Sequence, residues 1–395
     1  MQIVLQSKNI ARVCVAMMFV IGASTSWANY NQTSDINETY GLLNKILKKN
    51  ESTIASFNNR YGNSSRCNNV KSCGTVSFTN TAVGRYRVDM SKAGRANQDL
   101  NFQVMAVGDN SVRCKVGSSG NVGDHFSYTG YLSISFNVLC HDYRGRPANS
   151  RFLVSTVGHG SRNGDHLHAS ANVHKSGGSS RLNHGFMNTG DYRNSYYEVE
   201  TKRDQKGIYR IKLPGWRATD VNSVRLTAYD DNSNFCTVLP DIQERTGTGY
   251  RGQGFEAHVR VTCFNQKGDF SDTGFSLLVE KSYKGPTGRG VQKTIAKKTK
   301  GAWTDWDFKG TGAKLSLADT NSTIMLAHKN YSSRISFPFV TSLMKRKYCK
   351  IGSYKTRTVN SVPLLDVKVR CYELNKGLAS SVLSWNFSSN LVSIN

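Results

Sequence analysis

The chain has 395 residues and carries 52 Lys+Arg against 27 Asp+Glu, which gives a net charge of +25. It contains no G-x-S-x-G nucleophile elbow, no phosphate loop and no dinucleotide fingerprint, which excludes the hydrolases and nucleotide-binding enzymes that those motifs define. Beyond the N-terminal segment nothing approaches 18 consecutive apolar residues, so we expect no membrane anchor there.

Residues 1–28 are predicted to be an export signal. Lys8 and Arg12 form its positive region, residues 13–22 form its apolar core, and residues 26–28 form a small-x-small cleavage site. We place the start of the mature chain at Asn29, which predicts a secreted or periplasmic protein.

The next segment, residues 29–50, is predicted to contain a short amphipathic helix. Leu42, Leu43, Ile46 and Leu47 follow one another at helical spacing, which favours a helix over residues 38–49. Its expected role is to pack against the first domain.

An internal repeat organises the rest of the chain, with copies about 123 positions apart. The first two copies read GRYRVDM, FQVMAVGDNSVRCKV, FNVLCHDYRGRPANSRFLV and GIYRIKL, VRLTAYDDNSNFCTV, VRVTCFNQKGDFSDTGFSLLV. The third copy is degenerate and reads SRISFPF, KRKYCKI and VKVRCYELNKGLASSVLSW. A period of this size predicts a string of homologous domains.

Each copy contains one pair of cysteines, and export makes disulfide bonds the expected state of these pairs. Zinc is the alternative, but no copy has the Cys-x-x-Cys spacing of a structural site. With a fourth pair that closes a small loop, the predicted bridges are Cys67–Cys73, Cys114–Cys140, Cys236–Cys263 and Cys349–Cys371.

Apolar and polar residues alternate within each copy, which is typical of strands that are buried on one face. Residues 109–111 and 231–233, both Asp-Asn-Ser, are predicted to form a hairpin turn before the first cysteine of each pair. Gly145 and Gly268 mark the next turn, five residues after the second cysteine.

These patterns predict an all-β chain of three tandem antiparallel β-sandwich domains with immunoglobulin-like proportions and internal disulfide bonds. The expected boundaries are residues 51–157 for repeat 1, 158–283 for repeat 2, and 302–395 for the degenerate and basic repeat 3. Residues 284–301, which contain no acid, are expected to be an exposed basic linker or a long loop.

The repeat pattern G-x-Y-x-V, V-x-A, the Asp-Asn-Ser turn, C-x-V and V-x-C resembles a repeat of exported bacterial β-rich proteins. The resemblance covers roughly residues 74–280 well and the last third poorly. It implies secretion and a β-repeat fold. It implies no catalytic residues, because that group has no assigned activity.

Five of the nine histidines lie within 26 residues of one another. In an extended segment, His166 and His168 point to the same face and could present two imidazoles to one metal ion. The candidate ligands for Zn²⁺ or Cu²⁺ are Asp165, His166, His168, His174 and His184. The alternative is a solvated Gly/Ser-rich connector.

Basic residues are concentrated at the C-terminal end, with 20 basic against 5 acidic residues from Lys281 onward. Arg87, Arg210 and Arg334 recur at one position of the repeat and could bind a polyanion, although an exposed strand position also tolerates Arg. The C-terminal residues predicted to bind a polyanion are Lys293, Lys297, Lys298, Lys300, Lys345, Arg346 and Lys347.

The sequence thus predicts an exported binding or adhesion protein of the cell surface or extracellular matrix. Its expected partner is acidic polysaccharide, lipopolysaccharide or extracellular DNA, and self-association is possible. No catalytic residue and no cofactor other than the metal ion is expected. The alternatives are a secreted toxin or metal-dependent hydrolase that uses residues 159–184, and a subunit of a filament or coat.

Overall fold

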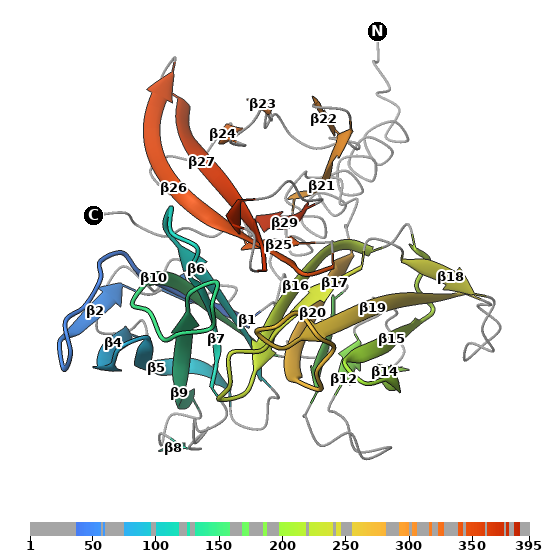
Figure 1. The fold of residues 1–395 in the computed structure, drawn as a ribbon, viewed down its shortest axis with the longest axis horizontal. Helices are drawn as coiled ribbons and strands as arrows, with labels where there is room; N and C mark the ends of the chain where they lie inside the picture. The colour runs from blue at the N-terminus through green and yellow to red at the C-terminus, as the bar shows by residue number, and fades with distance from the viewer. Residues whose placement is uncertain are drawn as a thin grey trace, which may run out of the picture.

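The computed structural model describes the protein over residues 37–56, 58–59, 75–95, 100–117, 125–126, 131–158, 168–173, 185–187, 197–218, 221–239, 242–245, 255–281, 292–299, 302–305, 316–317, 323–327, 339–342, 345–359, 362–374, 377–378 and 383–387. These residues form an all-β fold without an α-helix (Figure 1). Within them, accordingly, no helix is long and apolar enough to cross a membrane.

The strands form four sheets, two of them large. The first sheet has the order β23 (Ser316–Leu317), β24 (Thr323–Ala327), β27 (Val362–Glu373), β26 (Lys347–Val359), β6 (Leu100–Val107), β10 (Arg151–Gly158), β1 (Asn37–Leu43) and β3 (Asn58–Asn59), and β28 (Gly377–Leu378) pairs with β27. The second has the order β13 (Tyr197–Glu198), β12 (Gly185–Met187), β11 (His168–Val173), β20 (Gly274–Lys281), β16 (Val221–Tyr229), β7 (Arg113–Val116), β9 (Tyr131–His141), β5 (Arg85–Arg95), β4 (Thr75–Ala82) and β2 (Ser52–Ser56), and β8 (His125–Phe126) pairs with β9.

The other two sheets are smaller. One has the order β14 (Glu200–Gln205), β15 (Ile208–Pro214), β19 (Glu256–Phe264) and β17 (Phe235–Val238), and β18 (Gln243–Arg245) pairs with β19. The other has the order β22 (Ala302–Asp305), β21 (Gln292–Thr299), β29 (Leu383–Phe387) and β25 (Phe339–Ser342).

The same strand pairing occurs three times along the chain. The ladder β1-β10-β6 recurs as β11-β20-β16 and as β21-β29-β25, and the ladder β5-β9-β7 recurs as β15-β19-β17 and as β24-β27-β26. We call residues 37–158 set 1, residues 168–281 set 2 and residues 292–387 set 3. The internal repeat of the sequence is therefore a repeat of strand order.

The large sheets arise where one set continues into another. β6 of set 1 meets β26 of set 3 through one parallel pair, Val107 with Ile351, and β16 of set 2 meets β7 of set 1 through Tyr229 with Val116. At the third junction β17 of set 2 contacts β25 of set 3. Every set thus contacts the other two, and the equivalent strands β6, β16 and β25 converge at the centre.

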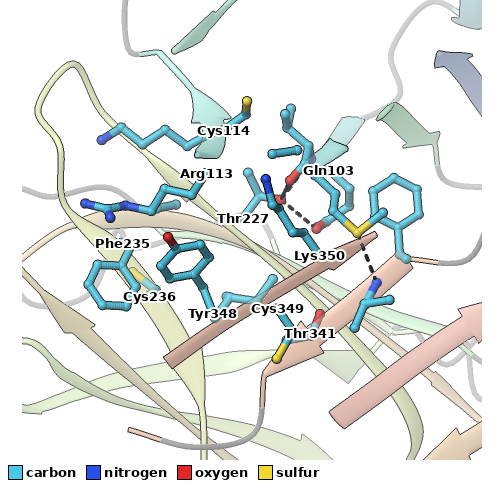
Figure 2. Close-up of a pocket in the computed structure, with 18 of the residues that line it drawn as sticks. Gln103, Arg113, Cys114, Thr227, Phe235, Cys236, Thr341, Tyr348, Cys349 and Lys350 are labelled. Carbon is cyan, nitrogen blue, oxygen red and sulfur yellow. Dashed lines mark hydrogen bonds between the residues drawn. The ribbon is translucent and has the colours of Figure 1, made fainter. Parts of the chain in front are cut away.

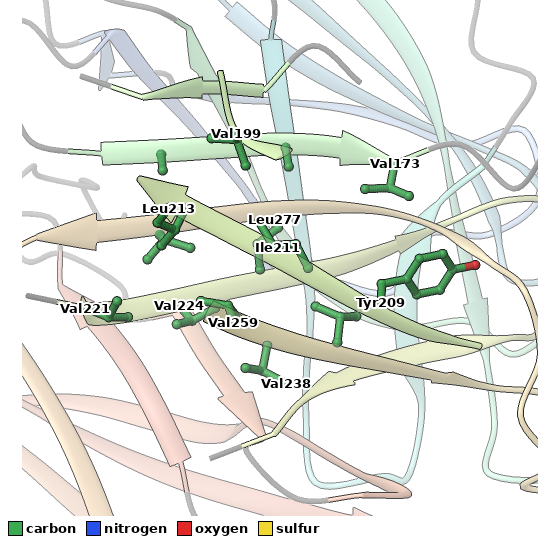
Figure 3. Packing of buried hydrophobic residues seen from close by; sticks show 14 of the residues in the cluster. Val173, Val199, Tyr209, Ile211, Leu213, Val221, Val224, Val238, Val259 and Leu277 are labelled. Atoms are coloured by element: carbon green, nitrogen blue, oxygen red, sulfur yellow. The ribbon is translucent and has the colours of Figure 1, made fainter. Parts of the chain in front are cut away.

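The predicted alternation of buried and polar residues is confirmed in the strands. Along β15, Tyr209, Ile211 and Leu213 are fully buried, whereas Arg210 and Lys212 are only partly covered. Figure 3 shows these three buried side chains packed with apolar residues of the facing strands in the core of set 2. The fold therefore has the buried layer between sheets that is typical of a β-sandwich.

The disulfide prediction is confirmed for the three repeated pairs. Each bridge joins directly opposed residues of neighbouring antiparallel strands, and the residues bonded are Cys114–Cys140, Cys236–Cys263 and Cys349–Cys371. Three such bridges indicate an oxidising extracellular or periplasmic environment. The predicted Cys67–Cys73 bridge and the signal segment lie outside the described residues.

The predicted N-terminal helix over residues 38–49 is wrong. Residues 37–43 form β1, whose seven residues all pair with β10. Leu43 and Leu47 are buried, but Ile46, which the helix would place beside them, is 57% exposed. An isolated short helix is marginal in water, whereas pairing with β10 satisfies the backbone of the strand and leaves Leu43 buried.

The Asp-Asn-Ser turns also differ from the prediction of a hairpin. The strands on either side of residues 109–111, β6 and β7, belong to different sheets, and so do β16 and β17 around residues 231–233. The turn is therefore a corner between two sheets. The side chains of Asn110 and Asn232 still act locally as predicted, because each accepts a hydrogen bond from the amide two residues later.

Candidate functional site

Two of the three repeated arginines lie on equivalent strands, and each is paired with an aspartate of its own set. Arg87 on β5 is exposed, and its Nε lies 2.9 Å from Asp89 Oδ1. Arg210 on β15 donates from Nη2 to Asp204 Oδ2 at 2.7 Å. Arg334 lies outside the described residues. These local carboxylates reduce the charge that the two arginines present to a polyanion.

Part of the predicted basic linker is a strand. Residues 292–299 form β21, which pairs with β22 and β29, so this part is not a loop. Its backbone carries Lys293, Lys297 and Lys298, whereas Lys300 lies outside the described residues.

The other predicted lysines lie at the start of the β26–β27 hairpin. Lys345 and Arg346 form an exposed turn, and Lys347 is the first residue of β26. Arg346 has φ of 57°, and its carbonyl accepts a hydrogen bond from the Leu374 amide at 3.0 Å, which closes the base of the hairpin.

The predicted metal site falls almost wholly outside the described residues. His168 begins β11, where its backbone pairs with Glu280. The other four candidates, Asp165, His166, His174 and His184, are not described. Within the part of the chain that the structure describes, no group of three or more His, Cys, Asp or Glu side chains could hold a metal ion.

The structure instead gathers functional side chains where the three sets meet. Arg113, Phe235 and Tyr348 occupy the same position of the repeat, directly before the first cysteine of each pair. The Arg113 guanidinium lies 4.9 Å from the ring centre of Phe235 and 5.6 Å from that of Tyr348. The two rings are themselves 6.2 Å apart. One residue from each set therefore meets at the centre of the molecule in a cation–π cluster.

Two lysines join neighbouring sets at this junction. Lys350 of set 3 donates to Asn110 Oδ1 of set 1 at 2.7 Å. Lys115 of set 1 donates to Asn232 Oδ1 of set 2 at 3.2 Å and forms a buried ion pair with Asp230. Each lysine therefore holds the Asp-Asn-Ser corner of the next set.

Among the residues that the structure describes, the third junction lacks this contact. Thr237 of set 2 stands at the equivalent position and shares a hydrogen bond of 3.0 Å with Thr262 of its own set. Set 2 meets set 3 through an apolar cluster, in which Phe235 and Phe264 are buried with Leu374. The difference is visible in the sequence as Cys-Lys in copies one and three and Cys-Thr in copy two. The contacts show what this difference does: the lysines bond to a neighbouring set, whereas Thr237 bonds within its own set.

A pocket of about 80 Å³ opens at the junction, with room for several water molecules. Figure 2 shows its lining, in which Lys350 lies among residues that come from all three sets. Gln103 of β6, Thr227 of β16 and Thr341 of β25 supply polar groups to its wall. The Thr227 hydroxyl donates to Gln103 Oε1 at 3.0 Å, which occupies that acceptor.

Buried basic residues are concentrated around this pocket. Among the residues whose burial the structure describes, four basic side chains other than histidine are buried, against one acid, Asp230. Three of them, Arg113, Lys115 and Lys350, line the pocket, and Arg225 stacks over Phe339 in its wall at 5.0 Å. Basic groups therefore outnumber acidic ones among the buried residues around the pocket.

Burial alters the acidity of two lining residues. Burial lowers the pKa of Lys350 to about 7; Asp109 opposes this shift and Arg151 adds to it. Burial also lowers the pKa of His141 to about 4, with further lowering from the cations of β7. His141 is thus neutral at physiological pH.

Sequence reasoning missed this junction, because its residues were considered only as parts of separate strands.

The chain matches no family model, no curated protein and no solved structure at a significant level. The resemblance to exported bacterial repeat proteins stays a prediction.

Proposed function

We propose that this is an exported protein that binds an acidic polymer at the cell surface or in the extracellular matrix. It would consist of three disulfide-bonded β-sandwich domains that correspond to the three sets. Acidic polysaccharide, lipopolysaccharide or extracellular DNA would bind to the basic third domain. The three disulfide bonds support the export of the chain, and its net charge of +25 supports a polyanionic partner.

The observation that carries this proposal is the β26–β27 hairpin. It is formed by strands of 13 and 12 residues, and residues 345–374 contain eight basic residues against two acidic ones. Figure 1 shows the hairpin extending away from the strands of sets 1 and 2. A long polymer could therefore reach the part of the hairpin that extends away without obstruction from those two sets.

The contacts divide the basic residues of the hairpin by role. Lys350 is buried at the junction, and Arg370 donates to Asp109 of set 1 at 3.4 Å. These two residues hold the hairpin on the body of the molecule. Lys345 and Arg346 are exposed at its base and are the first residues that we expect to contact the polymer.

The proposal can be tested by retention on heparin and on DNA columns. The triple variant Lys345→Gln, Arg346→Gln, Lys347→Gln should elute earlier, and the slope of log affinity against log salt should fall by about 2 to 3. The matched control removes three exposed charges from the other sets, Lys48→Gln, Lys49→Gln and Lys206→Gln, and should change retention much less. Retention of the wild type that does not change with salt between about 0.1 and 1 M would contradict the proposal. An equal loss of retention in the hairpin variant and in the control variant would contradict it as well.

A further inference from the structure

The junction pocket holds more buried positive charge than the described residues around it neutralise. Lys115 is paired with Asp230, the one buried acid among residues whose burial is described. Lys350 has as its hydrogen-bond partner a neutral amide, Asn110. Arg113 donates to backbone carbonyls of Asp142 at 3.4 Å and Ser233 at 2.8 Å.

The nearby carboxylates outside the pocket are already engaged. Asp142 accepts hydrogen bonds from Arg146, and both its Oδ atoms lie 2.9 Å from nitrogens of that residue. Asp109 is more than half exposed and accepts from Arg370. These acids therefore pair with Arg146 and Arg370, neither of which lines the pocket.

A buried charge without a counter-charge is costly, so a protein normally pairs it or discharges it. Lysine can discharge by losing its proton, but arginine stays protonated at every physiological pH. At least Arg113 must therefore remain charged beside the pocket. An anion inside the pocket would remove this cost, and it would favour the protonated form of Lys350 as well.

We infer that the pocket between the three sets binds one small oxyanion, a phosphate, sulfate or carboxylate group, next to Lys350, in a pocket that Arg113 also lines. The volume of the pocket suits a group of this size. Thr341 also lines the wall of the pocket. This site is separate from the proposed polymer-binding hairpin surface and does not depend on it.

Isothermal titration of the full mature protein with phosphate, sulfate and acetate tests the site, with chloride at equal ionic strength as the reference. We expect saturable binding of one anion per chain at pH 6.5. Lys350→Met should weaken it at least tenfold, Lys350→Arg should retain it, and the hairpin control Lys345→Gln should leave it unchanged. A lack of saturable binding in the wild type, or equal binding in Lys350→Met, would overturn the inference.

A second variant keeps the test valid if Lys350→Met does not fold. Asn110→Asp preserves the acceptor of Lys350 but places a carboxylate beside it, so it should compete with the anion and weaken binding at least tenfold. Unchanged anion binding in Asn110→Asp would contradict a site at Lys350. A wild-type protein that binds the anion but is not retained on heparin would overturn only the polymer proposal.

The source of the anion can be distinguished in the same experiment. Tighter binding of inorganic phosphate than of glucose 6-phosphate would identify a free ion as the ligand. Tighter binding of glucose 6-phosphate would identify the terminal group of a larger molecule.

Discussion

Lys350 Nζ donates a hydrogen bond to Asn110 Oδ1 at 2.7 Å, across 240 positions of sequence. The contact joins the last repeat to the first and helps to close the three sets around one centre. Asn110 at the same time accepts from the Val112 amide at 3.4 Å, so one side chain shapes the corner and holds the neighbouring set.

Asn110→Ala should therefore lower the free energy of unfolding by about 1–3 kcal/mol, because it leaves a buried ammonium group without its acceptor. Urea denaturation measures this change. Asn110→Asp is the matched control, since it keeps an acceptor and should be at least as stable as the wild type at pH 7. A fall of less than about 0.5 kcal/mol in Asn110→Ala would show that the bond contributes little.

The lowered pKa of Lys350 predicts a dependence of stability on pH. Its value falls from 10.5 in the unfolded chain to about 7 in the fold, so the unfolded state binds more protons between these pH values. Burial of the protonated Lys350 side chain therefore lowers the free energy of unfolding by its maximum amount below pH 7. This cost decreases as the pH rises and is lost at about pH 10.5. Asp109, Arg151 and the Tyr372 ring at 5.7 Å surround the ammonium group.

Urea denaturation of the wild type and of Lys350→Met at pH 6 to 9 isolates this effect. We expect the stability of the wild type relative to the variant to rise with pH, because the other titrating groups are common to both proteins. A difference that stays constant across this range would contradict a lowered pKa.

Removing the Cys236–Cys263 bridge, as Cys236→Ala with Cys263→Ala, should lower the free energy of unfolding by about 3 kcal/mol, from the loop entropy that the bridge removes from the unfolded chain. Differential scanning calorimetry under non-reducing conditions measures the change. Mass mapping of a non-reduced digest provides the control on pairing, and it should also contain Cys67 linked to Cys73. A crossed pattern between sets would refute the assigned bridges.

Phe235→Ala should be the most damaging single change at the junction of sets 2 and 3. The ring is 5% exposed and contacts Arg113, Tyr348 and Phe264, so its loss should leave a cavity that costs about 3–5 kcal/mol. Phe270→Ala, at a partly buried position against the same cluster, is the control and should cost less than half as much. Similar costs at both positions would show that the central cation–π cluster has no special role.

The sequence alone determined the local features of this protein. The two-residue alternation around Tyr209 and the repeated cysteine pairs predicted strands and the three described disulfide bonds correctly, because both depend on neighbours within one strand or on adjacent strands. The prediction of a helix was wrong, although Leu42, Leu43, Ile46 and Leu47 follow one another at helical spacing. Pairing of β1 with β10 outweighed this weak local preference for a helix.

Only the tertiary structure decided what lies at the centre. Lys115 and Lys350 were visible in the sequence as residues after a cysteine, but their burial depends on corners that belong to other repeats. Contacts over more than a hundred residues leave no periodic trace in the chain, whereas the buried charge and the pocket arise from such contacts alone. Strand order and disulfide bonds thus come from the repeat, and the concentration of buried basic residues at the junction comes from the way in which the three repeats pack together.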